Sequence, residues 1–363
     1  MMPLRILTLS KYGRQGASSR MRTFQYFPYW KEMKWTIKAS PLICDNALSV
    51  RYKDGRHNKK QTLKAYIERA RLLISSAKDY DLIWIEKEAF PWLPYFLEQS
   101  LINKTPYVLD YDDAIFHNYD LHRSKLVRQI YGEKLDQLMQ QAALVVCGNR
   151  YLADRARNAG ANQVVEIPTV IDLERYPCID FESTAQNDIP RIVWIGSPST
   201  AKYLEILAEP LRALAERIPF ILRLVGSGNK EIPGVRTEIM NWSEECEVEL
   251  IRSSTIGIMP LADSPWERGK CGYKLIQYMA CGLPTVASDV GANADVMVHG
   301  QTGFLAKSPH EWLSSLQALL ENSTLRERMG SAGRARVERF YCIQKTAPQL
   351  GEILNRVVMD SSR

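Results

Sequence analysis

The sequence lacks the features that mark several common classes of protein. No apolar run approaches the ~18 residues that a membrane-spanning helix needs, and we expect no signal peptide at its start. The seven cysteines form no CxxC pair, and no histidine spacing suits zinc. Low-complexity segments and sequence repeats are missing too. We therefore expect a cytoplasmic protein with reduced thiols, no metal and no cofactor.

The length and composition indicate a globular chain of roughly two domains. Of its 363 residues, 45% are hydrophobic and 24% are charged, which is an ordinary globular mixture. The net charge of +6 comes from the first half, where residues 1–185 hold 27 basic and 21 acidic residues against 20 and 20 in the rest. Residues 11–71 are the most basic, with 15 against 4. Such a surface attracts phosphates of an anionic acceptor, a membrane surface or a nucleic acid, although a merely solvated face is the alternative.

The first half alternates apolar runs with helical patterns. This alternation predicts a parallel sheet covered by helices on both faces, with ligands at the carboxyl ends of the strands. Gly13 and Gly16 follow the first strand but do not complete a GxGxxG motif, so a nicotinamide cofactor is not favoured. The predicted strands are 4–9, 81–85, 106–109, 143–146 and 164–167, and the predicted helices are 20–33, 60–75, 91–101, 122–141 and 150–159.

An acidic loop, DYDDAIFHNYD, follows the predicted strand at 106–109. Asp112 and Asp113 are adjacent carboxylates that could bind a metal, but capping of the next turn is at least as good an interpretation. His117 in the same loop could contact a ligand or act as an acid or base, although a lone histidine is more often structural.

The second half repeats the architecture after a segment without periodicity at 177–190, which we interpret as a linker. The sequence predicts two helices within 309–340, divided at Gly330, and a last helix over about 346–358. The fold class is therefore α/β, with two doubly wound Rossmann-like domains that face each other across a cleft. The predicted strands are 191–195, 220–225, 256–259 and 285–288, and the predicted helices between them start near 199, 244 and 270.

One stretch, PWERGKCGYKLIQYMACGLPTVAS, carries the strongest chemical pattern. Lys270, Lys274 and Gln277 recur at i, i+4 and i+7, which places them on one stripe of a helix. Gly269 and Gly272 leave the start of that helix open for an anion to approach backbone N–H groups. A solvated basic face is an equally good interpretation of this stretch alone.

Small-residue loops follow the other strands of the second half. Two loops with hydroxyl groups and a lysine-bearing helix start suit a diphosphate, and a flat indole beside them suits a nucleobase. Ordinary turn chemistry explains any one of these loops, but four at one sheet edge favour a binding site. The residues concerned are Gly196, Ser197, Ser199, Thr200, Gly226, Asn241 and Trp242.

The motifs resemble those of a known family, the retaining glycosyltransferases of family 4 with the GT-B fold. The resemblance rests on WIGSPST, YKLIQYMACGLPTVAS and VGANADVMVHGQTGFL in the second half, and on SSRMR, LDYDDAIF and VVCGNRYLA in the first. It implies an acceptor-binding domain at 1–176, a linker at 177–190 and a domain for the nucleotide-diphosphate-sugar at 191–343. It also implies that a helix at 344–363 crosses back onto the first domain, and that a sugar is transferred with retention of configuration.

The chain departs from the family pattern at positions that matter for catalysis. Where the family often has Glu, seven residues and Glu, this chain has Gly269 and Gln277, and Glu267 is the nearest acid. The resemblance implies that Lys270, Lys274 and Lys202 neutralise the diphosphate and that Gln277 binds the ribose. In the first domain, His117 or Asp113 would hold a sugar hydroxyl, and Gly16, Arg20 and Arg22 would meet the acceptor.

Two further functions stay open at this point. A relative that binds nucleotide-sugars without transferring them would fit the missing carboxylate at Gly269, and a nucleic-acid-binding protein would fit residues 11–71. We favour a glycosyltransferase of polysaccharide biosynthesis that acts on a glycan or lipid-linked acceptor, needs no metal and binds no nucleic acid. Its basic first domain would contact the anionic inner face of a membrane.

Overall fold

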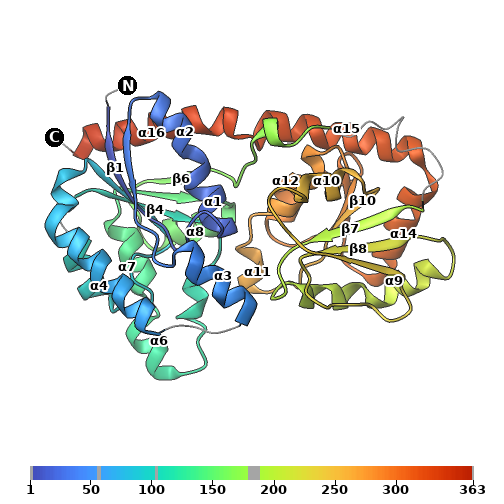
Figure 1. The fold of residues 1–363 in the computed structure, drawn as a ribbon, viewed down its shortest axis with the longest axis horizontal. Coiled ribbons are helices and arrows are strands. Elements are labelled where there is room, and N and C mark those ends of the chain that lie inside the picture. The colour runs from blue at the N-terminus through green and yellow to red at the C-terminus, as the bar shows by residue number, and fades with distance from the viewer. Residues whose placement is uncertain (1–2, 55–58, 103–104, 179–188, 362–363) are drawn as a thin grey trace. The chain divides into compact units, whose positions relative to one another are not determined.

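The computed structural model describes residues 3–54, 59–102, 105–178 and 189–361. The chain folds into two compact units, the first made of Met1–Thr169 with Thr346–Arg363 and the second of Val170–Lys345. The predicted linker falls mainly on residues 179–188, outside the described residues. Figure 1 shows that each unit contains a sheet with helices packed on it.

The first unit is built on six parallel strands in the order β2-β1-β3-β4-β5-β6. All residues of β3, β4 and β5 are buried, as expected for strands covered on both faces. The strands are β1 (Arg5–Leu9), β2 (Thr36–Ala39), β3 (Leu82–Glu86), β4 (Tyr107–Tyr111), β5 (Leu144–Cys147) and β6 (Val164–Glu166). The α-helices are α1 (Ala17–Arg22), α2 (Phe27–Glu32), α3 (Asp45–Asp54), α4 (Lys59–Ser76), α5 (Tyr95–Ile102), α6 (Lys125–Tyr131), α7 (Lys134–Gln141), α8 (Arg150–Asn158) and α16 (Ile343–Ser361).

The second unit has the same kind of sheet, with strand order β12-β11-β10-β7-β8-β9. The strands are β7 (Arg191–Ile195), β8 (Ile221–Val225), β9 (Thr237–Met240), β10 (Ile256–Met259), β11 (Thr285–Ser288) and β12 (Gly303–Ala306). The α-helices are α9 (Ala208–Ala215), α10 (Glu247–Arg252), α11 (Pro265–Arg268), α12 (Tyr273–Ala280), α13 (Ala292–Val296), α14 (Pro309–Glu321) and α15 (Ser323–Phe340). Short 3-10 turns complete the two units at η1 (Phe24–Tyr26), η2 (Ala77–Asp79), η3 (Ile115–Asn118), η4 (Leu173–Arg175) and η6 (Ala201–Leu207).

The break between α14 and α15 corrects the prediction that Gly330 divides them. The helices separate at Asn322, whose side chain accepts a hydrogen bond from the Leu325 N–H at 2.8 Å and so caps α15. Gly330 is buried inside α15. An asparagine N-cap supplies a specific bond, whereas a glycine inside a helix costs only about 1 kcal/mol and is tolerated where packing favours it.

The helix α12 lies at the centre of the second core. Leu275, Ile276, Tyr278 and Met279 are fully buried there. The Tyr278 hydroxyl accepts a hydrogen bond from the backbone N–H of Ile195 at 3.0 Å. The apolar stripe of the YKLIQYMA segment therefore anchors the end of β7. Among the described residues, no helix is both long and apolar enough to cross a lipid bilayer.

Candidate functional site

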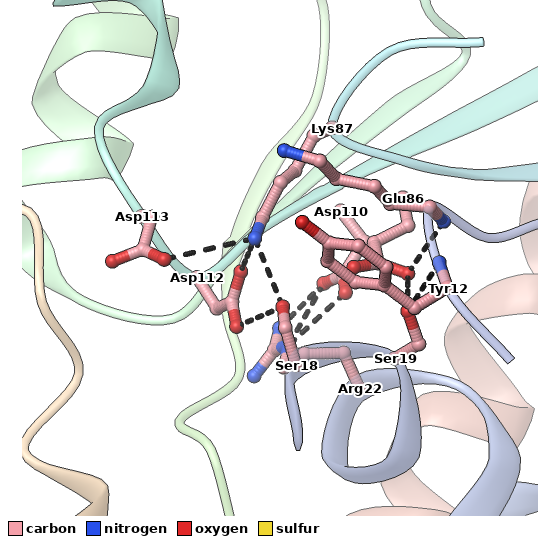
Figure 2. A network of polar contacts seen from close by, with 10 residues as sticks. Tyr12, Ser18, Ser19, Arg22, Glu86, Lys87, Asp110, Asp112 and Asp113 are labelled. Carbon is pink, nitrogen blue, oxygen red and sulfur yellow. Dashed lines mark hydrogen bonds and ion pairs between the residues drawn. The ribbon is translucent and has the colours of Figure 1, made fainter. Parts of the chain in front are cut away.

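The sheet of the first unit reverses its direction of growth between β1 and β3. In parallel α/β sheets the loops at the carboxyl ends of such neighbouring strands diverge and leave room for a ligand. Figure 2 shows that the loops after β1, β3 and β4 bring their polar side chains together at this edge.

Lys87, directly after β3, is the centre of this cluster. Its backbone takes the left-handed conformation (φ 67°), and its ammonium lies 2.8 Å from the Asp112 carboxylate and 3.7 Å from that of Asp113. It also donates to Ser18 at 2.9 Å, and the Ser18 hydroxyl bonds to Asp112 in turn. Burial opposes ionisation of Asp112, but the charge of Lys87 and these hydrogen bonds outweigh it and hold the pKa below its ordinary value.

Glu86, the last residue of β3, orders the loop after β1. It is fully buried, and one carboxylate oxygen accepts hydrogen bonds from the Ser19 hydroxyl at 2.5 Å and from the Lys11 N–H at 3.0 Å. The Ser19 hydroxyl also accepts from the N–H of Tyr12 at 3.0 Å. A buried carboxylate therefore fixes this loop, and Figure 2 shows Glu86 beside Tyr12 and Ser19.

The structure argues against the acceptor role expected for Arg20 and Arg22. Both are buried, with 3% and 2% of their surface exposed. The Arg22 guanidinium forms a buried ion pair with Asp110 at 2.5 Å and donates to the Ile167 carbonyl at 2.8 Å. Its charge is thus used inside the unit, where it ties α1 to the sheet, and it does not form part of an exposed basic face.

His117 is also held within the unit. Its Nδ1 lies 2.8 Å from Asp120 and its Nε2 lies 2.8 Å from the Tyr151 hydroxyl, so both ring nitrogens have partners. Asp113, by contrast, keeps 30% of its side chain exposed, and its carboxylate lies 3.7 Å from the Lys87 ammonium. Gly16 caps α1, and a Cβ there would collide with Tyr12. Of the predicted residues in this loop region, Asp113 is the best placed to reach a ligand.

The sheet of the second unit reverses between β7 and β10, and the predicted glycine loops lie on one side of that point. The Gly196 N–H donates to the Val225 carbonyl at 3.0 Å, and the Gly226 N–H donates to that of Met240 at 2.8 Å. Gly226 has φ +74° and lies so close to Gly196 that a Cβ would collide with its carbonyl oxygen. The loops after β7, β8 and β9 are therefore neighbours, as predicted for a single sheet edge.

The hydroxyl groups in the first of these loops bond to one another. Ser197 lies 2.9 Å from the Ser199 hydroxyl, and its N–H donates to the Thr200 hydroxyl at 3.2 Å. The next basic residue, Lys202, is exposed and its ammonium lies 5.0 Å from the centre of the Tyr203 ring.

The predicted lysine stripe is divided by a helix break. Lys270 lies in the connection between α11 and α12, and Lys274 lies in the first turn of α12. The break occurs because Gly272, the N-cap of α12, takes a left-handed conformation with φ +66°. Both lysines are half-buried, and the Lys274 ammonium lies 5.2 Å from the centre of the Trp194 ring. The two ammonium groups therefore belong to different segments and not to one helical face.

Glu267, the acid nearest to the missing family carboxylate, is already engaged. It is 6% exposed, and its carboxylate accepts hydrogen bonds from the hydroxyls of Tyr203 and Ser264. Burial by itself would raise its pKa, but these hydrogen bonds and the charge of Lys270 outweigh it and lower the pKa. A buried carboxylate thus persists near Lys270, two residues before the position of the family motif.

Gln277 is buried rather than open to a ligand on the predicted stripe. Its amide donates to the Tyr176 hydroxyl at 2.9 Å, which donates to Glu247 at 3.0 Å and lies 3.3 Å from the Tyr273 hydroxyl. Glu247 also accepts a hydrogen bond from the indole N–H of Trp242 at 2.9 Å. Hydrogen bonds through Tyr176 and the buried Glu247 carboxylate therefore connect Gln277, the predicted ribose contact, to Trp242, the predicted nucleobase contact. Asn241, the neighbour of the indole, is exposed.

Several residues of these clusters were not predicted from the sequence. Glu86 and Lys87 carry a usable signal, because a run of charges directly follows a buried strand. Tyr176 and Glu247 carry none, since they lie 101 and 30 residues before Gln277 and meet it only in the fold. Among the described residues, no group of three or more His, Cys, Asp or Glu side chains is arranged to hold a metal ion.

Known structures share the fold of the whole chain. A sucrose-phosphate synthase of Thermosynechococcus elongatus superposes with a TM-score of 0.72, covering 99% of this chain and 100% of that one at 16% identity. Alr3699/HepE of Anabaena, solved in complex with UDP-glucose, superposes with a TM-score of 0.70. The superposition covers 97% of this chain and 100% of that one at 16% identity. The chain thus has the two-domain α/β fold of the GT-B glycosyltransferases, which confirms the predicted fold class.

The sequence comparisons find similarity to glycosyltransferases. Residues 189–322 match the model of the glycosyl transferases group 1. A D-inositol 3-phosphate glycosyltransferase of Pseudarthrobacter chlorophenolicus is 26% identical over 40% of this chain and 38% of its own length. A phosphatidyl-myo-inositol mannosyltransferase of Mycobacterium tuberculosis is 27% identical over 54% of this chain and 56% of its own length. The chain therefore spans less than two thirds of these relatives, and residues 189–322, most of its second unit, are similar to the group 1 glycosyl transferases.

Proposed function

We propose that the protein transfers a sugar from a nucleotide-diphosphate-sugar to a glycan or lipid-linked acceptor, with retention of anomeric configuration. The observation that carries the proposal is the arrangement of the second unit, where two glycine and hydroxyl loops, the Trp242 loop and two lysines follow strands at one sheet edge. The names of the relatives support it, since they transfer sugars to inositol phosphate or to a phosphatidylinositol.

The donor would bind to the second unit. Lys270 and Lys274, with Lys202, would neutralise the diphosphate, and each charge-assisted hydrogen bond contributes about 1.5–3 kcal/mol. The hydroxyls of Ser197 and Thr200 would add neutral donors to the same phosphates. Trp242 would stack against the base, with its plane fixed by Glu247.

The transfer itself requires positioned cations rather than a covalent cofactor. As the diphosphate leaves, negative charge grows on its oxygens, and lysines already in place stabilise that charge without reorganisation. The acceptor hydroxyl would then attack the same face of an oxocarbenium-like sugar. We propose no metal and no cofactor besides the nucleotide-sugar. Asp113, a half-buried acid at the edge of the first sheet, would hold a hydroxyl of one of the two sugars.

Incubation with UDP-, GDP- and ADP-sugars and an acceptor panel tests the proposal. We expect one donor to be consumed and an α-linked or β-linked product that keeps the donor configuration, as read by NMR. Tight donor binding without transfer or hydrolysis would instead support a non-catalytic binder that lacks a carboxylate at position 269. Salt-dependent binding of DNA or RNA that survives loss of Lys270 and Lys274 would support the nucleic-acid alternative.

A further inference from the structure

A group of apolar side chains lies on the surface of the first unit and has no part in the proposed transfer chemistry. Large apolar residues exposed singly are common, but a contiguous group marks an interaction surface. The members, which we call the apolar patch, are Trp92 (50% exposed), Phe96 (67%), Leu97 (42%), Leu121 (59%), Leu126 (65%) and Ile130 (50%).

Trp92 lies shortly before α5 and beside the end of α6. It stands between β3 and α5 in a left-handed conformation (φ 63°), three residues before the start of α5. Its ring centre lies 5.9 Å from that of Tyr131, the last residue of α6, and 5.9 Å from that of His122. Leu126 and Ile130 are one turn apart on α6 and therefore share a face. The indole therefore lies beside the end of α6, and both α5 and α6 pack against α7.

The helix α6 buries none of its seven residues. A helix this short has little stability of its own in water. It is held by Arg128, which donates to the backbone carbonyls of His122 at 2.5 Å and Arg123 at 3.2 Å. An ordered helix that presents leucine and isoleucine to solvent therefore has an unfilled apolar face.

The rim of the patch is basic. Arg123, Lys125 and Arg128 are exposed, and none forms an ion pair with a carboxylate in the part of the chain that the structure describes. Glu133, two residues beyond α6, is the one exposed acid that follows closely in the sequence. The surface therefore combines aliphatic groups, an indole and unneutralised positive charge.

We propose that the apolar patch docks the first unit onto an anionic lipid bilayer. Tryptophan favours the membrane–water interface, short amphipathic helices insert their aliphatic face below the head groups, and basic residues attract anionic lipids. A second copy of the chain fits less well, because a symmetric contact would bring two basic rims together. The role of this docking in reaching a lipid-linked acceptor rests on the proposed function, but binding to the bilayer can be measured without any sugar.

Co-sedimentation of the full chain with vesicles tests the proposal without any activity assay. Vesicles of phosphatidylcholine alone are compared with vesicles that contain phosphatidylglycerol as well. The test variants are Leu126→Ser with Ile130→Ser, and Arg123→Ser with Lys125→Ser. The matched control is Ile206→Ser with Met359→Ser, two side chains that are 38% and 45% exposed outside the patch. Because α6 has no buried residue, all variants should fold, which circular dichroism and thermal unfolding verify.

We expect the wild type and the control to bind the anionic vesicles equally. The basic pair should lower the partition coefficient about 25-fold, at roughly fivefold for each charge near the surface, and only on anionic vesicles. The aliphatic pair should lower it about tenfold or more. The proposal is overturned if the wild type does not bind anionic vesicles, or if the aliphatic pair binds as the wild type does. A dimer that the aliphatic pair dissociates would also overturn it and assign the patch to a second copy.

Discussion

The carboxyl edges of the two sheets differ in how deeply their basic side chains are buried and paired. At the edge of the first unit, Arg22 and Lys87 are buried and each is neutralised by an aspartate. At the edge of the second, Lys202 is exposed and Lys270 and Lys274 are half-buried beside glycine and hydroxyl loops. The charges of the first edge are thus neutralised inside the unit, whereas the lysines of the second edge are partly or fully exposed, where we propose that the anionic donor binds.

The largest expected effect is a loss of stability when the buried ion pair at the first edge is removed. Arg22→Met should lower the free energy of unfolding by about 3–5 kcal/mol, because it leaves the Asp110 carboxylate buried without its partner. Arg5→Met is the matched control, since it removes an exposed ion pair with Asp81 and should cost about 0–1 kcal/mol. Urea unfolding measures both. Equal effects for the two variants would show that the buried pair does not organise the edge.

The next effect tests the cations of the second edge. Lys274→Ala should lower kcat/KM for transfer by roughly 10- to 150-fold, the equivalent of about 1.5–3 kcal/mol for one charge-assisted bond. Lys307→Ala, which removes an exposed surface pair with Asp289, is the control and should leave kcat/KM unchanged. An active Lys274→Ala enzyme would remove Lys274 from the diphosphate site.

A third effect concerns Lys134, a second buried cation of the first unit that faces two carboxylates. Lys134 lies 2.7 Å from Glu88 and 2.8 Å from Glu98, and burial raises the pKa of Glu98 to about 7. A carboxyl whose pKa is raised in the folded state binds a proton more tightly there than in the unfolded chain, so stability is lost as the pH rises from about 4.5 to 7.

Glu98→Gln mimics the protonated form and should remove this loss. Relative to the wild type, the variant should gain on the order of 2 kcal/mol in unfolding free energy between pH 5 and pH 8, because the amide does not ionise. Urea unfolding at the two pH values gives the difference and cancels the titration of other groups. A difference that does not change with pH contradicts the raised pKa.

The smallest expected effect concerns the carboxylate behind the indole. Glu247→Gln keeps the shape of the side chain but replaces a charged acceptor of the Trp242 and Tyr176 hydrogen bonds. We expect KM for the donor to rise about fivefold, near 1 kcal/mol, with kcat almost unchanged, since the plane of the base contact loosens while the lysines stay in place. A fall in kcat alone would place Glu247 in the chemistry instead.

The fold was predictable because its signals are local. Apolar runs such as residues 106–109 and 256–259 are long enough to be buried strands, and their alternation with helical patterns defines parallel sheets. The closeness of the glycine loops was predictable too, because all strands of a parallel sheet have their carboxyl ends at one edge. The position of a helix break was less predictable, because a capping asparagine at 322 and a left-handed glycine at 272 override the periodicity.

The state of individual side chains was not predictable from spacing. Arg22 and Gln277 look available in the sequence, yet their partners Asp110 and Tyr176 lie 88 and 101 residues away and bury them. His117 is likewise held by Tyr151, 34 residues further on. Packing decides which polar groups meet over such separations, so a sequence can place a residue at an edge without revealing which groups it contacts there.

Titration calorimetry with nucleoside diphosphates tests most directly the claim that the second edge holds the donor. UDP, GDP and ADP are titrated into the wild type, the double variant Lys270→Ala with Lys274→Ala, and Asp113→Asn in the first unit. We predict that one diphosphate binds the wild type and Asp113→Asn with similar Kd, and that binding to the double variant is at least 100-fold weaker, at about 1.5–3 kcal/mol for each lysine. Binding that survives in the double variant and is lost in Asp113→Asn would contradict the account.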